Sequence, residues 1–157
     1  MLQRDLKNKD IGMELTFRRA TVEDVPGIIA LCNECFSERT NVDSAIWVFN
    51  ATSYDTNQIY LNGEFGGRII AHAKITVIQT IYGEMGTYAV LNHVCVKPEY
   101  RRQHIATALL NEIVKICKTL GCKRMCLWSK NFRTDAHEFY KKLGFELLEA
   151  GFFQKDI

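Results

Sequence analysis

The pattern of hydrophobic and polar positions predicts a strand and a helix near the start of the chain. Residues 1–13 are polar and aperiodic, which is typical of a loose tail, and Leu15 to Arg19 predicts a short strand. Thr21 followed by Asp24 forms a capping box that opens a helix, with Pro26 tolerated in its first turn. That helix has apolar residues at helical spacing, namely Val25, Ile28, Ile29, Cys32 and Phe36.

The middle of the chain predicts a second helix and then a hairpin. The helix is expected at about Ser44 to Ala51. Gln58 to Phe65 and Arg68 to Thr80 flank Gly66-Gly67, which supplies the positive φ of a tight turn. Tyr88 to Val96 is rich in β-branched and aromatic residues and predicts the next strand.

A long amphipathic helix is expected at about 102–120. Its apolar residues recur every three or four positions, at Ile105, Leu109, Ile113, Ile116 and Leu120. Lys123 to Ser129 follows as a strand, so strands 88–96 and 123–129 are joined by a helical crossover and should run parallel. The hairpins on either side make the rest of the sheet antiparallel. A mixed α/β sheet with helices on both faces follows.

The last part of the chain predicts a short helix and a further strand or hairpin. Asp135 is placed to cap the helix and Gly144 to end it. Phe145 to Lys155 then supplies the last strand or hairpin.

Composition narrows the class of protein. The 157 residues are 47% hydrophobic and 24% charged, which fits a single compact domain over 1–157. A net charge of +2, with both signs scattered, argues against nucleic acid or membrane as partner. Six cysteines lie within helix or strand patterns, with neither a signal peptide nor a long apolar run, so we expect a reduced, cytoplasmic protein. Cys32 and Cys35 form a lone CxxC, which favours buried helix cysteines over a redox or metal site.

The turn into the long helix carries a weak phosphate-binding pattern. A helix N-terminus offers unpaired N–H groups and a partial positive charge. Arg101, Arg102 and Gln103 add donors there, and Ala106 keeps the first turn narrow. A solvated basic helix start is the common alternative, and the turn alone does not outweigh it.

The wider context decides between these alternatives. Tyr-Arg-Arg-Gln-x-Ile-Ala before the helix, and Phe-Tyr-Lys-Lys-Leu-Gly-Phe after it, resemble the GNAT superfamily of acetyl-CoA-dependent N-acetyltransferases. The resemblance covers nearly the whole chain from Leu15 and is sharpest at Val94 to Leu110 and Ala136 to Phe145. It implies a mostly antiparallel central sheet of six to seven strands with one splayed parallel pair. It also implies acetyl-CoA as co-substrate and no metal.

The resemblance implies a set of residues that hold acetyl-CoA. The pantetheine arm would bond to the main chain of Val94, Cys95 and Val96, and Asn131 would lie near the cofactor. The pyrophosphate would lie on the amides of the turn, formed by Arg101, Arg102, Gln103, His104, Ile105, Ala106 and Thr107. His104 replaces the first glycine of the family's loop.

Tyr140 is the expected general acid. The resemblance places it near the cofactor sulfur, where a phenol can protonate the leaving thiolate without being ionised at neutral pH. The alternative is a core aromatic on an apolar helix face.

The general base is left open. Many relatives carry a glutamate in the middle of the strand that ends in Val96, where this chain has Asn92 and His93. Histidine is the side-chain type that can act as a base near neutral pH, so His93 is the leading candidate, against the alternative of a buried structural histidine. Glu84, acting through water, is the second candidate. His72 and Lys74 share one face of the preceding strand and could line the acceptor site or meet solvent, and solvent is the favoured expectation.

The expected reaction is direct attack of a small primary amine on acetyl-CoA in a ternary complex, and Cys95 is expected to act through its main chain, not as a nucleophile. A protein N-terminus or lysine is the alternative acceptor. Glu34, Glu38 and Asp43 would favour a cationic acceptor. A non-catalytic acyl-CoA sensor is the alternative of another class, and a homodimer is expected only by analogy.

Overall fold

A computed structural model describes residues 14–84 and 86–157 of the chain. The expected loose tail at 1–13 lies outside the described residues. The described chain forms two compact units that divide after Leu127, and each is described by itself.

The N-terminal elements of the first unit follow the sequence pattern closely. Strand β1 (Thr16–Arg19) leads into a short 3₁₀ turn, Val22–Asp24, and helix α1 (Val25–Phe36). The capping box is present, because Asp24 Oδ2 accepts from the backbone N–H of Thr21 at 2.7 Å. Helix α2 (Val42–Thr52) begins two residues earlier than expected, since Asn41 Oδ1 accepts from Ser44 N at 2.9 Å and caps it.

The sheet of the first unit has five strands in sequence order, β1-β2-β3-β4-β5. Strands β2 (Gln58–Phe65), β3 (Arg68–Ile78) and β4 (Tyr88–Val96) pair antiparallel, and β5 (Arg124–Leu127) pairs parallel to β4. The predicted hairpin and the predicted parallel pair are therefore confirmed. The expectation of six to seven strands is wrong for the described residues.

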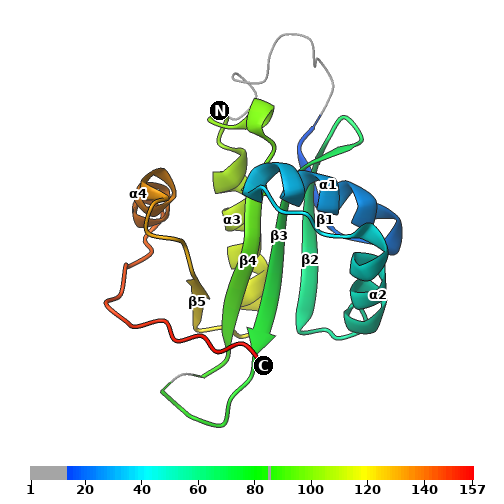
Figure 1. Cartoon of the computed structure of the whole chain (residues 1–157). Coiled ribbons are helices and arrows are strands. Elements are labelled where there is room, and N and C mark those ends of the chain that lie inside the picture. Colours follow the sequence, from blue (N-terminus) through cyan, green and yellow to red (C-terminus); the bar gives the residue numbers. More distant parts are fainter. Residues whose placement is uncertain (1–13, 85) are drawn as a thin grey trace. The chain divides into compact units, whose positions relative to one another are not determined.

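Helices cover both faces of this sheet (Figure 1). Helix α1 packs on β3 and β4 from one side, with α2 beside it, and α3 (Ile105–Thr119) packs on the same two strands from the other. The buried side chains between these layers include Ile70, Ile75, Leu109 and Ile113, each with no measurable exposure. This core fixes β3 and β4, the two strands that carry the site.

Two boundaries in the crossover differ from the prediction. Helix α3 begins at Ile105 and not at about residue 102, because Arg102 and His104 have φ of 58° and 60° and cannot belong to a right-handed helix. Strand β5 ends at Leu127 and not at Ser129.

The second unit, Trp128–Ile157, contains helix α4 (Thr134–Lys142) and no strand. Asp135 lies in the first turn of α4 and is not its cap, which is Arg133. The strand expected at Phe145 to Lys155 is absent: a strand needs a neighbour for its backbone groups, and this segment pairs with none in the described chain. This missing strand is one reason why the predicted strand number was too high.

Candidate active site at the bulge of strand β4

Strand β4 contains a β-bulge at its middle. His72 of β3 pairs with Cys95, whereas Lys74 pairs with Asn92, so β4 has one extra residue in this interval. His93 lies in the bulge and has φ of 50°, a left-handed conformation that costs an L-residue roughly 1 kcal/mol. The bulge turns the His93 side chain out of the regular alternation of the strand.

The His93 imidazole is held by side chains at the end of α1. Its Nε2 lies 3.2 Å from Oε1 and 3.3 Å from Oε2 of Glu38, and its ring meets the Phe36 ring edge-on at 5.3 Å between centroids. The His93 side chain is 46% exposed. The alternative that His93 is a buried structural histidine is therefore wrong.

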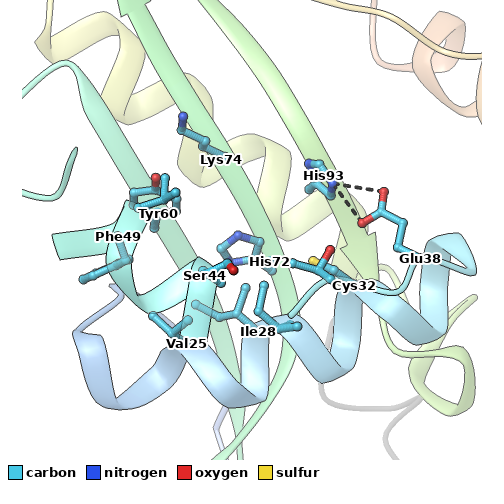
Figure 2. Close-up of a pocket in the computed structure, with 14 residues that line it drawn as sticks. Val25, Ile28, Cys32, Glu38, Ser44, Phe49, Tyr60, His72, Lys74 and His93 are labelled. Atoms are coloured by element: carbon cyan, nitrogen blue, oxygen red, sulfur yellow. Dashed lines mark hydrogen bonds and ion pairs between the residues drawn. The ribbon is translucent and has the colours of Figure 1, made fainter. Parts of the chain in front are cut away.

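The Glu38–His93 pair lies at one end of a pocket of about 380 Å³ between the helices α1 and α2 and the sheet (Figure 2). A volume of this size suits a small organic ligand. The pocket is lined by Val25, Ile28, Ile29, Cys32, Glu38, Thr40, Ser44, Ala45, Val48, Phe49, Tyr60, His72, Lys74 and His93. Tyr60, with Lys74 5.4 Å from its ring centroid, lies toward the opposite end.

His72 lies in the wall of this pocket and does not meet solvent, which corrects the sequence-based expectation. It is 2% exposed, and its Nδ1 lies 2.8 Å from Asn62 Oδ1. Burial, and secondarily the nearby His93, lower the pKa of His72 to about 4. His72 is therefore neutral at physiological pH. Lys74 also lines the pocket.

The parallel strands β4 and β5 separate beyond the first half of β4. Their pairing runs from Tyr88 with Arg124 to Leu91 with Leu127 and then stops. From Asn92 to Val96, β4 has no strand partner on that side in the described part of the chain. Val94, Cys95 and Val96 thus lie along an open main-chain edge, as the splayed pair requires.

The turn before α3 presents backbone amides. The first helical hydrogen bond of α3 runs from Ala108 N to the His104 carbonyl at 3.0 Å, which leaves the N–H groups of His104 to Thr107 without a partner inside the helix. His104, whose side chain makes no capping bond, takes the left-handed conformation that a glycine would adopt. The histidine therefore has a backbone conformation that glycine adopts without steric penalty.

Two side chains of the turn are used inside the fold. Arg101 Nε donates to the Val96 carbonyl at 3.0 Å, and Gln103 Nε2 donates to the Glu99 carbonyl at 3.2 Å. The Arg101 bond connects the turn to the end of β4, and the Gln103 bond connects two residues of the segment before α3. The Val96 carbonyl is thereby already occupied.

Cys95 points into the core under α1. It is 7% exposed and clusters with Ile28, Leu31 and Cys32. Hydrogen bonds with the Cys32 and Cys35 thiols, together with burial, raise the pKa of Cys95 well above its ordinary value. All six cysteines are free thiols, and Cys35 Sγ donates to the Val96 carbonyl at 3.5 Å.

Tyr140 and Asn131 belong to the second unit. Tyr140 lies in α4, with the Phe139 and Phe145 rings each 5.4 Å from its own. Asn131 lies in the turn that precedes α4. Their predicted roles near the cofactor stay predictions.

Glu84 lies far from the bulge. It precedes Tyr88, where β4 begins, and the five residue-to-residue steps from Tyr88 to His93 span about 16 Å. Its carbonyl accepts from Arg124 Nη2 at 3.2 Å. This position does not favour Glu84 as the base.

The described residues contain neither a metal-binding cluster of side chains nor a helix that could span a membrane. No three His, Cys, Asp or Glu side chains there form a group that could hold a metal ion. In residues 14–84 and 86–157, no helix has both the length and the apolar character needed to cross a membrane.

The sequence pattern missed the contact between Glu38 and His93. The two residues are 55 positions apart, and no local spacing indicates that they meet. Tyr60, Thr40 and Ser44 were also not foreseen as pocket residues. The only sequence signal for a site here was the acidic character of the region around α1, which contains Glu34, Glu38 and Asp43.

Comparison with known proteins identifies the family. The profile of the Acetyltransferase (GNAT) family matches residues 26–145, which is most of the chain. The chain therefore belongs to the GNAT acetyltransferase family, a class of acyltransferases.

One relative is similar in sequence over part of its length. An uncharacterised N-acetyltransferase of Methanocaldococcus jannaschii is 38% identical over 62 residues, which is 40% of this chain and 27% of that protein. The match thus spans about a quarter of that relative's length.

Solved structures share the fold. A transcriptional regulator of Bacillus halodurans aligns with a TM-score of 0.83 and 22% identity, covering 91% of this chain and all (100%) of that one. An aminoglycoside N-acetyltransferase in complex with CoA aligns with a TM-score of 0.80 and 16% identity, covering 92% and 96%. At these identities the similarity establishes the fold alone.

Proposed function

We propose that this chain is an N-acetyltransferase that moves the acetyl group of acetyl-CoA to a primary amine of a small molecule. The observation that carries the proposal is the pocket of about 380 Å³ beside the β4 bulge, with the His93 imidazole in its wall. The pocket and the open edge of β4 use neighbouring parts of the same strand.

The open edge and the turn fit acetyl-CoA. The main chain of Val94 and Cys95 would bond the pantetheine arm, and the amides of His104 to Thr107 would hold the pyrophosphate. Asn131 would lie near the cofactor, as the family resemblance implies. Val96 contributes less than expected, because its carbonyl already accepts from Arg101 and Cys35.

His93 would act as the base. The amine arrives mostly protonated and must lose one proton before its nitrogen attacks the thioester carbonyl, and a second as the amide forms. His72 is a poor alternative, since burial lowers its pKa to about 4. The C–S bond then breaks, and Tyr140 would supply the proton that converts the thiolate to free CoA.

No covalent enzyme intermediate is needed. The Cys95 thiol is buried and held protonated by its raised pKa, which supports direct attack in a ternary complex.

The pocket lining supports a compact amine with an apolar body. Val25, Ile28, Ile29, Val48 and Phe49 form much of the wall, and Glu38 supplies an anion beside the expected reacting nitrogen. The volume of about 380 Å³ favours a small molecule over a peptide, which needs a long groove. A protein N-terminus or lysine is the alternative acceptor.

The alternative function outside the enzymes is a non-catalytic acyl-CoA sensor. The replacement of a loop glycine by His104 would favour it. Calorimetry with acetyl-CoA, followed by thiol release with a panel of amines, separates the two. Binding with turnover of at least one amine supports the enzyme, whereas binding without any turnover supports the sensor.

A further inference from the structure

The Glu38–His93 contact joins the end of α1 to the bulge of β4, and the backbone has a left-handed conformation at both places. Among the described residues, four non-glycine positions have positive φ: Ser37, His93, Arg102 and His104. The last two form the turn before α3. The first two belong to the Glu38–His93 contact. Ser37 ends α1 in the left-handed region immediately before Glu38, and His93 is the other partner of the contact. Strain of this kind persists where the surroundings fix it and gathers at functional sites.

The imidazole is fixed by more than its carboxylate partner. The Phe36 ring meets it at an interplanar angle of 86°, and the bulge sets its backbone. Figure 2 shows the Glu38 carboxylate directed at the His93 ring, with dashed lines from Nε2 to both carboxylate oxygens. The ring is thus oriented within the pocket before any ligand binds.

A neutral histidine has one N–H and one acceptor nitrogen. An ionised carboxylate can only accept, so the nitrogen that faces Glu38, Nε2, must carry the proton. Nδ1 is then the unprotonated nitrogen. When Nδ1 gains a proton, the ring becomes a cation beside the Glu38 carboxylate.

We propose that Glu38 is a positioning residue for His93: it holds Nε2–H and presents Nδ1 as the atom that removes the proton from the acceptor amine. This inference rests on the proposed N-acetyltransferase function. Nδ1 takes the first proton from the ammonium nitrogen and passes it to solvent before the attack; it then takes the second proton as the amide forms and releases that one to solvent as well. Glu38 itself neither gains nor loses a proton.

The alternative is a surface ion pair without a role in the reaction. The two side chains are 46% and 37% exposed, and exposed pairs contribute about 0–1 kcal/mol to stability. A pair of that kind would leave turnover unchanged when Glu38 is replaced.

The first test needs no substrate. Ring ¹⁵N NMR of the free protein, with His93 assigned by loss of its signals in His93→Asn, reports which nitrogen is protonated in the neutral state. Asparagine is chosen because it tolerates positive φ. We expect protonated Nε2 and unprotonated Nδ1. A neutral ring with its proton on Nδ1 overturns the proposal, whether or not an acceptor amine has been found.

The second test is a double-mutant cycle on amine turnover. Glu38→Gln should lower kcat about 10- to 100-fold with little change in the Kd for acetyl-CoA. The same substitution in the His93→Asn background should have little further effect, because the residue it positions is gone. Equal losses in both backgrounds would overturn the proposal.

Glu112→Gln is the matched control. Glu112 forms an ion pair with Lys115 on α3 at 3.0 Å and does not line the pocket. It should keep wild-type turnover. If Glu112→Gln and Glu38→Gln slow the reaction equally, the effect is one of general surface charge and the positioning role is refuted. If no amine is turned over by the wild type, the proposed function fails, and the ring NMR still tests whether Nε2 carries the proton beside Glu38.

Discussion

Nδ1 of His72 lies 2.8 Å from Oδ1 of Asn62, and both residues are almost completely buried, at 2% and 0% exposure. They pair across β2 and β3, and His72 lies in the wall of the candidate acceptor pocket. Their contact makes the pocket wall polar at a point where the sequence pattern indicated solvent. It also makes the fold sensitive to acid.

His72 should destabilise the protein as the pH falls. Its pKa is lowered from 6.5 to about 4 in the fold, so below pH 6.5 the unfolded chain binds a proton that the native chain refuses. Stability is therefore lost as the pH falls from about 6.5 to about 4, by about 3 kcal/mol from this group.

Chemical denaturation of wild type and His72→Gln at pH 7 and pH 4.5 measures this loss. Between pH 7 and pH 4.5, the free energy of unfolding of His72→Gln should fall by about 2 kcal/mol less than that of the wild type. The exposed His104, replaced by Gln, is the control and should keep the wild-type dependence. Identical slopes for wild type and His72→Gln would show that His72 is not buried in the neutral form.

His104→Gly should stabilise the fold. His104 has φ of 60°, where glycine carries no steric penalty, so we expect a gain of up to about 1 kcal/mol in the free energy of unfolding. His104→Ala keeps the strain and removes the imidazole, so it should show no such gain.

The same two variants test the phosphate turn. Since the side chain makes no capping bond, acetyl-CoA should bind both variants within about 1 kcal/mol of wild type by calorimetry. A loss of more than tenfold in both would mean that the imidazole contacts the ligand.

Cys95→Ala should keep full turnover at a cost of about 1 kcal/mol in stability, because it removes a buried sulfur from the cluster under α1. Intact-mass analysis after mixing wild type with acetyl-CoA should find no acetylated cysteine. A trapped acetyl-Cys95 would refute direct attack.

Tyr140→Phe should lower kcat at least about 100-fold if Tyr140 protonates the leaving thiolate, with little change in acetyl-CoA affinity. Tyr54, which is 90% exposed, provides the control substitution Tyr54→Phe. Unchanged turnover in Tyr140→Phe would leave the tyrosine as a packing partner of Phe139 and Phe145.

Local signals in the sequence predicted most of the fold. The Gly66-Gly67 turn, the strand Tyr88–Val96 and the capping box at Thr21 each depend on neighbouring residues, and all three are present. The segment Phe145 to Lys155 was mispredicted because a strand depends on a partner far away in the sequence, which apolar content does not reveal.

The candidate site could also be predicted only where the signal is local. His93 was proposed as a site residue from its place in the strand, and the turn before α3 was proposed from its motif. The bulge, the Glu38 contact and the burial of His72 depend on register between β3 and β4 and on where α1 ends. No spacing within the chain encodes these relations.

The most direct test of the N-acetyltransferase proposal is thiol release from acetyl-CoA with a panel of primary amines that ranges from compact apolar amines to aminoglycosides and peptides. We expect turnover with compact amines of apolar body, and a large loss of that turnover in His93→Asn with acetyl-CoA still bound. Tight binding of acetyl-CoA with no thiol release for any amine, or turnover unchanged in His93→Asn, would contradict the account.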